Sequence, residues 1–187
     1  MQSFLASLRL VVATMLISVV AYSAVVLGIA QLLTPATANG SLIANAQGQV
    51  VGSKLIAQKF TEPRYFWPRP SAVDYNAAGA GGSNKSPTST DLTERATGTV
   101  AAYGATAANP LPADLAAASG GGLDPHITEQ SALYQVPRIA AARGIPAAGI
   151  DELVARYSFA PGGILAPDRL VNVLELNLAL DQMAPAS

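Results

Sequence analysis

The stretch Leu10–Leu33, LVVATMLISVVAYSAVVLGIAQLL, decides how this 187-residue chain is built. It contains 24 consecutive residues without Asp, Glu, Lys, Arg, Pro or Asn. As a helix that rises about 1.5 Å per residue it is roughly 36 Å long, and the hydrocarbon core of a bilayer is about 30 Å thick. We therefore predict a leader at residues 1–9 and a transmembrane helix at residues 10–33.

A cleaved signal peptide is the alternative, because Ala36-Thr37-Ala38 has the small-x-small form of a cleavage site. The apolar region of a signal peptide is only about 7–15 residues long, however, so the length favours an uncleaved anchor. Arg9 is the only charged side chain before Lys54. The positive-inside rule then predicts a cytoplasmic N-terminus and places everything after about residue 34 on the outer face of the membrane.

One face of the predicted span carries small side chains at alternating spacings of four and three. These residues are Thr14, Ser18, Ala21, Val25 and Gly28. Tyr22 lies near the middle of the span, too deep for its hydroxyl to reach water. We expect this face to pack against a partner helix, and a helix alone in lipid is the alternative.

The overall composition excludes several classes of function. Only 12% of the residues are charged and the net charge is -1, so binding of nucleic acid is not expected. Contact with membrane lipid is expected only at the span. The absence of cysteine excludes disulfides, iron–sulfur clusters, zinc sites with cysteine ligands and thiol catalysis. With one histidine and scattered carboxylates, no metal site is expected.

After a Thr/Ala/Asn/Gly linker at residues 34–49, residues 50–187 are predicted to form one compact external α+β domain. Residues 50–60 have the pattern of a strand followed by a short helix. Residues 62–76 contain three prolines and four aromatic residues, which predicts an extended, packed loop. Residues 79–90 are a loop by composition, and Asp91 and Glu94 have the spacing of a capping box at a helix start.

Further helices are predicted at Thr128–Arg143 and Ile150–Tyr157. Gly144 is placed to end the first of them, and Pro137 should kink or split it. The residues Val171–Leu178 alternate apolar and polar side chains, which is typical of a half-buried strand.

Three groups of residues invite a catalytic or binding interpretation, and each has a simpler one. Gly79–Ser86 misses the phosphate-binding G-x-x-x-x-G-K-[ST] pattern because Asn84 stands at the second glycine. Ser119, Asp124 and His126 are the residue types of a catalytic triad, but they lie within eight residues, which favours a structural loop. Arg64 and Arg69 flank an aromatic run that includes Trp67, which indicates a clamped loop or a protein contact.

Several segments, in order, resemble the KdpC family, the small C subunits of the Kdp potassium-transporting P-type ATPase. The segments that resemble family motifs are GSKLIAQKF (52–60), YFWPRPSA (65–72), GGSNKSP (81–87), SGGGLDPHI (119–127), QVPRIA (135–140) and VNVLELNLAL (171–180). Pro68, Gly121 and Pro137 depart from the commonest pattern. In this reading the segment Gly79–Ser86, which misses the phosphate-binding pattern by one residue, is a loop typical of the family.

The resemblance implies a non-catalytic subunit of a high-affinity, ATP-driven K⁺ import complex in the bacterial inner membrane, with its main domain periplasmic. Its partners are then a channel-like K⁺-conducting A subunit, an ATP-hydrolysing B subunit and a small F subunit. The family's C subunit is described as a stabilising partner and as a catalytic chaperone that raises the ATP affinity of the B subunit. This implies no cofactor of its own, with ATP acting on the partner subunit, and ties Gln135 to the nucleotide role.

An external domain does not meet cytosolic ATP, so an effect on ATP affinity is expected to pass through the complex. Loops at Arg64, Trp67, Arg69, Ser83, Asn84 and Asp124 are candidate subunit contacts. Two alternatives stay open. One is a free-standing anchored module that binds an extracellular ligand with the Arg64/Trp67/Arg69 loop, and the weaker one is an external hydrolase that uses Ser119 and His126.

Overall fold

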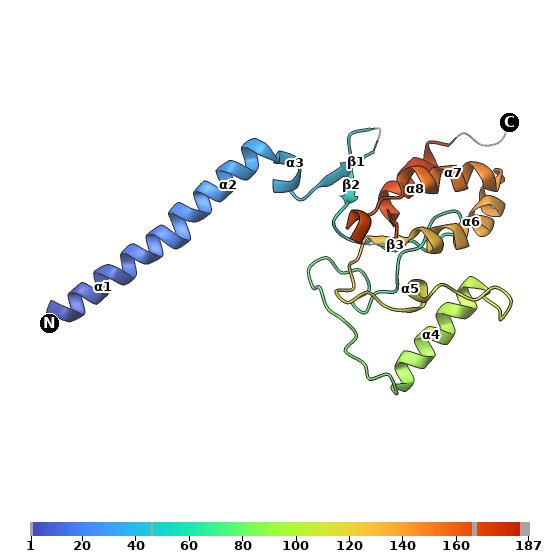
Figure 1. The fold of residues 1–187 in the computed structure, drawn as a ribbon, viewed down its shortest axis with the longest axis horizontal. Coiled ribbons are helices and arrows are strands. Elements are labelled where there is room, and N and C mark those ends of the chain that lie inside the picture. The colour runs from blue at the N-terminus through green and yellow to red at the C-terminus, as the bar shows by residue number, and fades with distance from the viewer. Residues whose placement is uncertain (1, 46, 166–167, 184–187) are drawn as a thin grey trace. The chain divides into compact units, whose positions relative to one another are not determined.

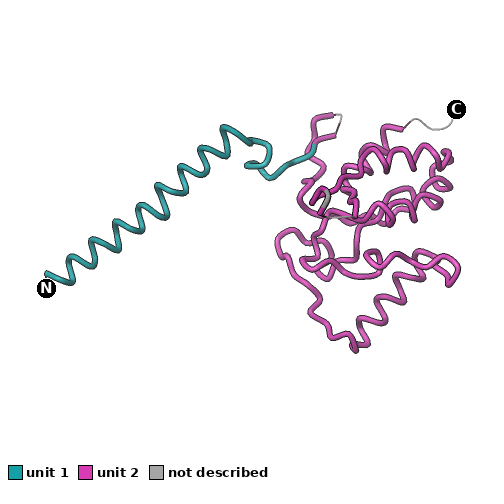
Figure 2. Tube along the Cα trace, in the orientation of Figure 1, with its two compact units in different colours: residues 1–43 teal, residues 44–187 magenta. Residues whose placement is uncertain are grey.

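The computed structural model describes residues 2–45, 47–165 and 168–183. The chain forms two compact units, residues 1–43 and residues 44–187 (Figure 2). The strand β1 (Leu42–Ala44) crosses the boundary between them.

The N-terminal unit is dominated by one long helix, Gln2–Leu33, which consists of α1 (Gln2–Met15), the π-helical turn η1 (Leu16–Ala21) and α2 (Tyr22–Leu33). A short α3 (Pro35–Ala38) follows. None of the residues 2–33 is buried, and the predicted span 10–33 lies within this helix. Within the described residues it is the one helix that is long and apolar enough to cross a membrane.

The second unit mixes short strands with helices. After β1, its elements are β2 (Val50–Ser53), α4 (Thr90–Tyr103), α5 (Ala113–Ala116), β3 (His126–Thr128), α6 (Glu129–Arg143), α7 (Ala147–Tyr157), η2 (Gly163–Leu165), β4 (Leu170–Asn172) and α8 (Val173–Asp181). The strands β3 and β4 pair antiparallel, with Ile127 opposite Val171. Both side chains are buried in one core with residues of α6, α7 and α8, which lie together in Figure 1. The described residues confirm an α+β fold with one helix suited to cross a membrane.

The predicted strand Val171–Leu178 is wrong beyond its first two residues. The strand β4 ends at Asn172, whose side-chain oxygen accepts a hydrogen bond from the Glu175 N–H (3.1 Å) and caps α8. Six of the nine α8 residues are buried, so the helix is apolar on more than one side. An enclosed helix of this kind produces alternation that resembles a strand.

Two other predicted elements also differ in the structure. The strand within residues 50–60 is present as β2, but the short helix after it is absent. The backbone of residues 54–57 forms long-range hydrogen bonds instead. The Lys54 carbonyl accepts one from the Asn172 side chain, and the Ala57 N–H donates one to the Leu123 carbonyl. The helix near Asp91 begins at Thr90 with Ser89 at the N-cap, so the predicted capping box is wrong; Asp91 lies inside the first turn and its carboxylate pairs with Lys85.

The helix α6 largely matches its predicted limits. The Thr128 side chain caps it by accepting from the Ser131 N–H (3.1 Å), and Gly144 ends it with a left-handed φ of 66°. It continues through Pro137, so the proline does not split it. The helix α7 also has its predicted end, at Tyr157, but begins three residues before the predicted start, Ile150.

Two glycine-rich loops, residues 79–83 and 119–122, pack directly against each other. The Gly81 N–H donates to the Gly121 carbonyl (2.9 Å), and a Cβ on Gly82 would lie 2.7 Å from the Gly120 oxygen. Gly122 has φ +70°, and a Cβ there would lie 2.9 Å from the Gly81 oxygen and 2.7 Å from Val73. Gly121 has open space around it, so a side chain such as the serine usual in the resembling motif would fit at this position without strain.

We predict that Gly122→Ala lowers the free energy of unfolding by about 1–3 kcal/mol, because it combines a left-handed φ with a steric clash. Chemical denaturation of the full-length chain in detergent measures this. The control is Gly121→Ala, whose new methyl group meets no heavy atom within 4 Å and should change stability by less than about 0.5 kcal/mol. Equal losses for the two variants would contradict the packing described here.

Candidate functional site

The backbone of the 62–76 loop is held by two buried side-chain amides. Asn177 of α8 accepts from the Phe66 N–H (2.8 Å) and donates to the Phe66 carbonyl (3.0 Å). Gln135 of α6 does the same for Trp67, at 2.8 and 3.1 Å. The two amides are 2% and 1% exposed. They satisfy four backbone groups in a proline-rich segment that forms no strand, so we call them the amide clamp.

Arg138, one turn after Gln135, supports the same loop from α6. Its guanidinium donates to the Gln135 side-chain oxygen (2.7 Å) and to the carbonyls of Pro63 (2.5 Å) and Tyr65 (3.1 Å). It also lies over the Trp67 ring, 3.9 Å from the centroid. Burial lowers the pKa of Arg138 from its ordinary value, although the neighbouring Tyr103 opposes this.

The beginning of the loop is tied to the end of α6 and to α8. Arg143 donates to the Arg64 carbonyl (2.8 Å) and to the Asp181 carboxylate (2.6 Å). The Tyr65 hydroxyl donates to the other oxygen of Asp181 (2.9 Å). The Arg64 side chain itself pairs with Glu62 at the surface.

The second half of the loop is held by Arg69 and Ser71. Arg69 pairs with Asp124 (3.1 Å), and its carbonyl accepts from the Tyr75 hydroxyl (2.9 Å). Burial alone would raise the pKa of Asp124, but hydrogen bonds from His126 and Arg69 outweigh it and the pKa is lowered. Ser71 donates to the Gly122 carbonyl (2.6 Å), which joins the loop to the glycine-rich contact.

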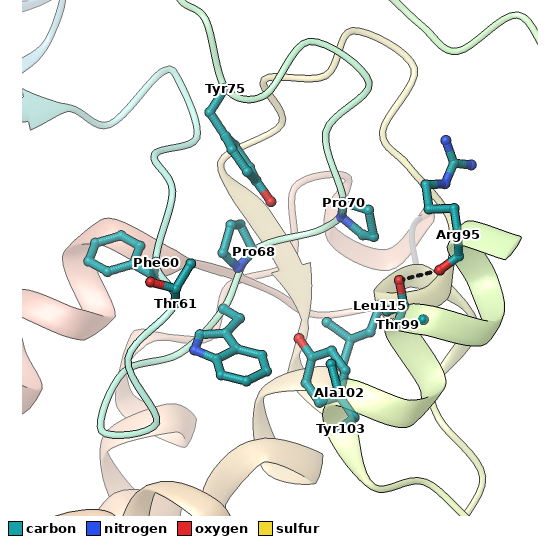
Figure 3. Close-up of a pocket in the computed structure, with 12 residues that line it drawn as sticks. Phe60, Thr61, Pro68, Pro70, Tyr75, Arg95, Thr99, Ala102, Tyr103 and Leu115 are labelled. Carbon is teal, nitrogen blue, oxygen red and sulfur yellow. Dashed lines mark hydrogen bonds between the residues drawn. The ribbon is translucent and has the colours of Figure 1, made fainter. Parts of the chain in front are cut away.

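A groove lies between this loop and α4 (Figure 3), with a volume of about 440 Å³. One wall is the loop, and the other is the α4 face with Leu115 of α5. The lining residues are Phe60, Thr61, Trp67, Pro68, Pro70, Tyr75, Arg95, Gly98, Thr99, Ala102, Tyr103 and Leu115. The Trp67 ring packs edge-on against Tyr103 (5.1 Å between centroids), so the residue that the amide clamp holds also lines the groove.

The structure separates the predicted contact residues into two groups. Arg69 and Asp124 meet in an ion pair, and Trp67 lies in the groove wall. Ser83 and Asn84 lie in the glycine-rich loop region, where Asn84 is exposed with φ +49°. The neighbouring Lys85 pairs with Asp91 instead of facing a phosphate site.

Ser119, Asp124 and His126 do not form a catalytic triad. Ser119 is 4% exposed and its hydroxyl oxygen lies 3.5 Å from the Asp124 N–H. His126 lies 3.5 Å from the Asp124 carboxylate, and within the described residues no hydrogen bond joins Ser119 to His126. Within the same residues there is no group of three or more His, Asp or Glu side chains that could hold a metal ion.

The predicted packing face of the span is exposed along its length. The Thr14 hydroxyl donates to the carbonyls of Leu10 and Val11, both at 2.9 Å. Ser18 and Ala21 lie in the π-helical turn, and Tyr22, the next residue, is 67% exposed. A Cβ on Gly28 would meet no heavy atom within 4 Å outside its own helix. This face is therefore free to meet another helix.

Sequence reasoning missed the residues that do most to hold the loop. It assigns Asn177 to a polar position of a strand, gives Arg138 no role beyond its place in a motif, and names Arg143 only as the end of a helix. The sequence does contain a signal for Asn177, because in LELNLAL it stands between leucines, where burial is expected. A buried amide requires hydrogen-bond partners.

Comparison with known proteins gives a family for the whole chain. The family model described as KdpC, K⁺-transporting ATPase, c chain, matches residues 4–182. The chain belongs to the KdpC family. The Potassium-transporting ATPase KdpC subunit of Parvibaculum lavamentivorans is 69% identical over 100% of both chains. The proteins of the same name from Geobacter sulfurreducens and Myxococcus xanthus are 47% and 45% identical, over 88% and 96% of this chain and 89% and 88% of theirs.

Family membership confirms the resemblance seen in the motifs, and with it a chain that is a subunit of a K⁺-transporting ATPase. The amide clamp and Arg138 fall inside two of those motifs, QVPRIA and VNVLELNLAL, and they hold the third, YFWPRPSA. The three KdpC-like segments thus form one structural unit.

We predict that Gln135→Leu loosens the loop around Trp67. The substitution leaves the partly buried N–H and carbonyl of Trp67 without their side-chain partner, which costs about 1–3 kcal/mol of stability. Trp67 is the only tryptophan, so its emission should shift to longer wavelength and be quenched more strongly by acrylamide.

The matched control is Gln130→Leu, because Gln130 is an exposed residue on the same helix. It should leave both the emission maximum and the quenching unchanged. A Gln135→Leu protein with the emission of the wild type would show that the clamp does not hold Trp67.

Proposed function

We propose that this chain is a non-catalytic, membrane-anchored subunit that stabilises an ATP-driven K⁺ import complex. The observation that carries the proposal is the family match over residues 4–182, together with the one helix among the described residues that is suited to cross a membrane. The absence of a Ser119–His126 contact among the described residues supports a non-catalytic role. The proposed partners are the channel-like A subunit, the ATP-hydrolysing B subunit and the small F subunit of the same complex.

We also propose that the chain raises the ATP affinity of the B subunit without touching ATP. With the N-terminus in the cytoplasm, the α+β domain lies outside the inner membrane, away from cytosolic nucleotide. Gln135 supports the indirect route, because its oxygen accepts from both Trp67 and Arg138, and its nitrogen donates to Trp67. Its role is then to hold the loop in place, and the effect on ATP is a coupling between distant sites.

The transmembrane helix contributes to assembly through its small-residue face in this proposal. Small side chains let two helices approach closely in lipid, and a neighbouring helix offers a partner for the Tyr22 hydroxyl. The π-helical turn supports this, because such turns are rare and often occur at functional positions.

The test of the proposed function is purification of the tagged full-length chain in mild detergent. Larger membrane proteins with K⁺-stimulated ATPase activity should co-purify with it. In that complex, Gln135→Leu should raise the KM for ATP several-fold, whereas Gln130→Leu should not, because only Gln135 holds the loop. A chain that purifies alone and without ATPase activity would instead favour a free-standing binding module.

Docking of the span is tested with single cysteines, since the chain has none of its own. Gly28→Cys and Ala21→Cys should crosslink to a helix of another subunit. Ala30→Cys is the control, because residues 28 and 30 lie about 200° apart around a helix and face opposite sides. Identical behaviour of all three cysteines would show that this face makes no helix contact.

A further inference from the structure

The helix α4 has an inner face that the domain covers only in part. Its 14 residues include none that is buried. The residues Leu92, Arg95, Ala96, Thr99 and Tyr103 follow one another at helical spacing, and all five are half-buried. An amphipathic helix of this length depends on burial of one face for its stability. Most of α4 lies away from α6, α7 and α8, beside α5 (Figure 1), although Tyr103 at its C-terminal end packs against Tyr134 of α6 (6.2 Å between ring centroids). The open groove runs along this half-covered face.

Arg95 brings an uncompensated positive charge to the groove. Of the ten basic side chains after the span, six form ion pairs and Arg138 donates to carbonyl and amide oxygens. Within the described residues, Lys54, Arg95 and Arg156 form no ion pair, and Lys54 and Arg156 are exposed. Arg95 is different, because its Nε is buried without a hydrogen-bond partner. In Figure 3 its guanidinium extends past Pro70 at the edge of the groove.

The opposite wall of the groove is aromatic and firmly held. Trp67 is fixed through its backbone by Gln135 and through its ring by Arg138 and Tyr103. Tyr75 is held by its bond to the Arg69 carbonyl, and burial raises its pKa to about 12. Pre-organised aromatic walls beside one charged group are typical of a binding site for an apolar anchor.

We propose that this groove receives a segment of another subunit of the same complex, with an apolar side chain on Trp67 and Tyr103 and a neighbouring Asp or Glu carboxylate on Arg95. The inference rests on the proposed function, since it requires a complex. Charge complementarity selects the carboxylate, because a half-buried guanidinium without an anion is costly.

The length of the uncovered face selects a protein segment as the occupant. The α4 residues that line the groove run from Arg95 to Tyr103, a rise of about 12 Å, which matches three to four residues of an extended peptide segment. Gly98 leaves room on the same side, because a Cβ there meets no heavy atom within 4 Å outside its own helix.

The first experiment places a benzophenone amino acid at position 98 of the full-length chain in the purified complex. The crosslink should join α4 to another subunit, at a peptide that contains Asp or Glu. The comparison site is Ala155, an exposed residue of α7. An intact complex in which position 98 captures only lipid, a second copy of this chain or nothing overturns the inference alone. A chain that purifies without a complex overturns the proposed function, and the inference with it.

The second experiment tests the charge. Arg95→Glu should lower retention of this subunit in the complex about tenfold or more at moderate salt, and replacing the carboxylate in the crosslinked peptide by Lys should restore it. Arg156→Glu is the matched control and should leave retention unchanged. Equal retention of the two variants overturns the pairing.

A third comparison, Gly98→Leu against Gly98→Ala, separates a blocked groove from an unfolded helix. Both replacements favour helix over glycine, but only the leucine side chain fills the groove.

Discussion

Because Phe66 is completely buried, its N–H and carbonyl lie where water does not reach them. A strand in this position would have found its partners in a neighbouring strand, but Pro63, Pro68 and Pro70 leave the segment with too few N–H groups for a ladder. Asn177 and Gln135 supply what a strand would have supplied. The burial of Phe66 in the core and the attachment of the loop to α6 and α8 depend on these bonds, since an orphaned buried pair is among the costlier defects in a protein.

The amide clamp also links the interior to the groove. Gln135 and Arg138 lie one turn apart on α6 and act on the same residue, one through the backbone of Trp67 and the other through its ring. The same ring also contacts Tyr103 of α4. A change at Gln135 therefore reaches α4 through two contacts, without any ligand at Gln135. This is a physical route by which a buried amide can alter an affinity measured on another subunit.

The sequence predicted well those features that local residues determine. The span follows from an uncharged run, and α6 lies close to its predicted limits, with its end set by Gly144; each signal lies within a few residues of its effect. The clamp joins positions 111 and 68 residues apart, and no local pattern shows which loop a buried amide will hold. The wrong strand prediction at α8 has the same origin. Asn177 is polar because it bonds the backbone of Phe66, and not because it faces solvent. The groove was not predicted, because the sequence does not show which basic side chains are left without an ion-pair partner in the fold. Arg95 is such a residue within the described part of the chain.

The low charge of the chain is only partly explained by its membrane span. After Leu33, 22 of 154 residues are charged, which is below the usual level for a soluble domain. Internal structure uses many of these, as in the pairs Arg69–Asp124, Arg143–Asp181 and Arg169–Glu129. Few charges then remain to keep the surface solvated, and a domain of this kind is better suited to be covered than to be free. A subunit of a K⁺-transporting ATPase has other subunits available to cover it, and the proposed docking places one of them on the half-covered face of α4.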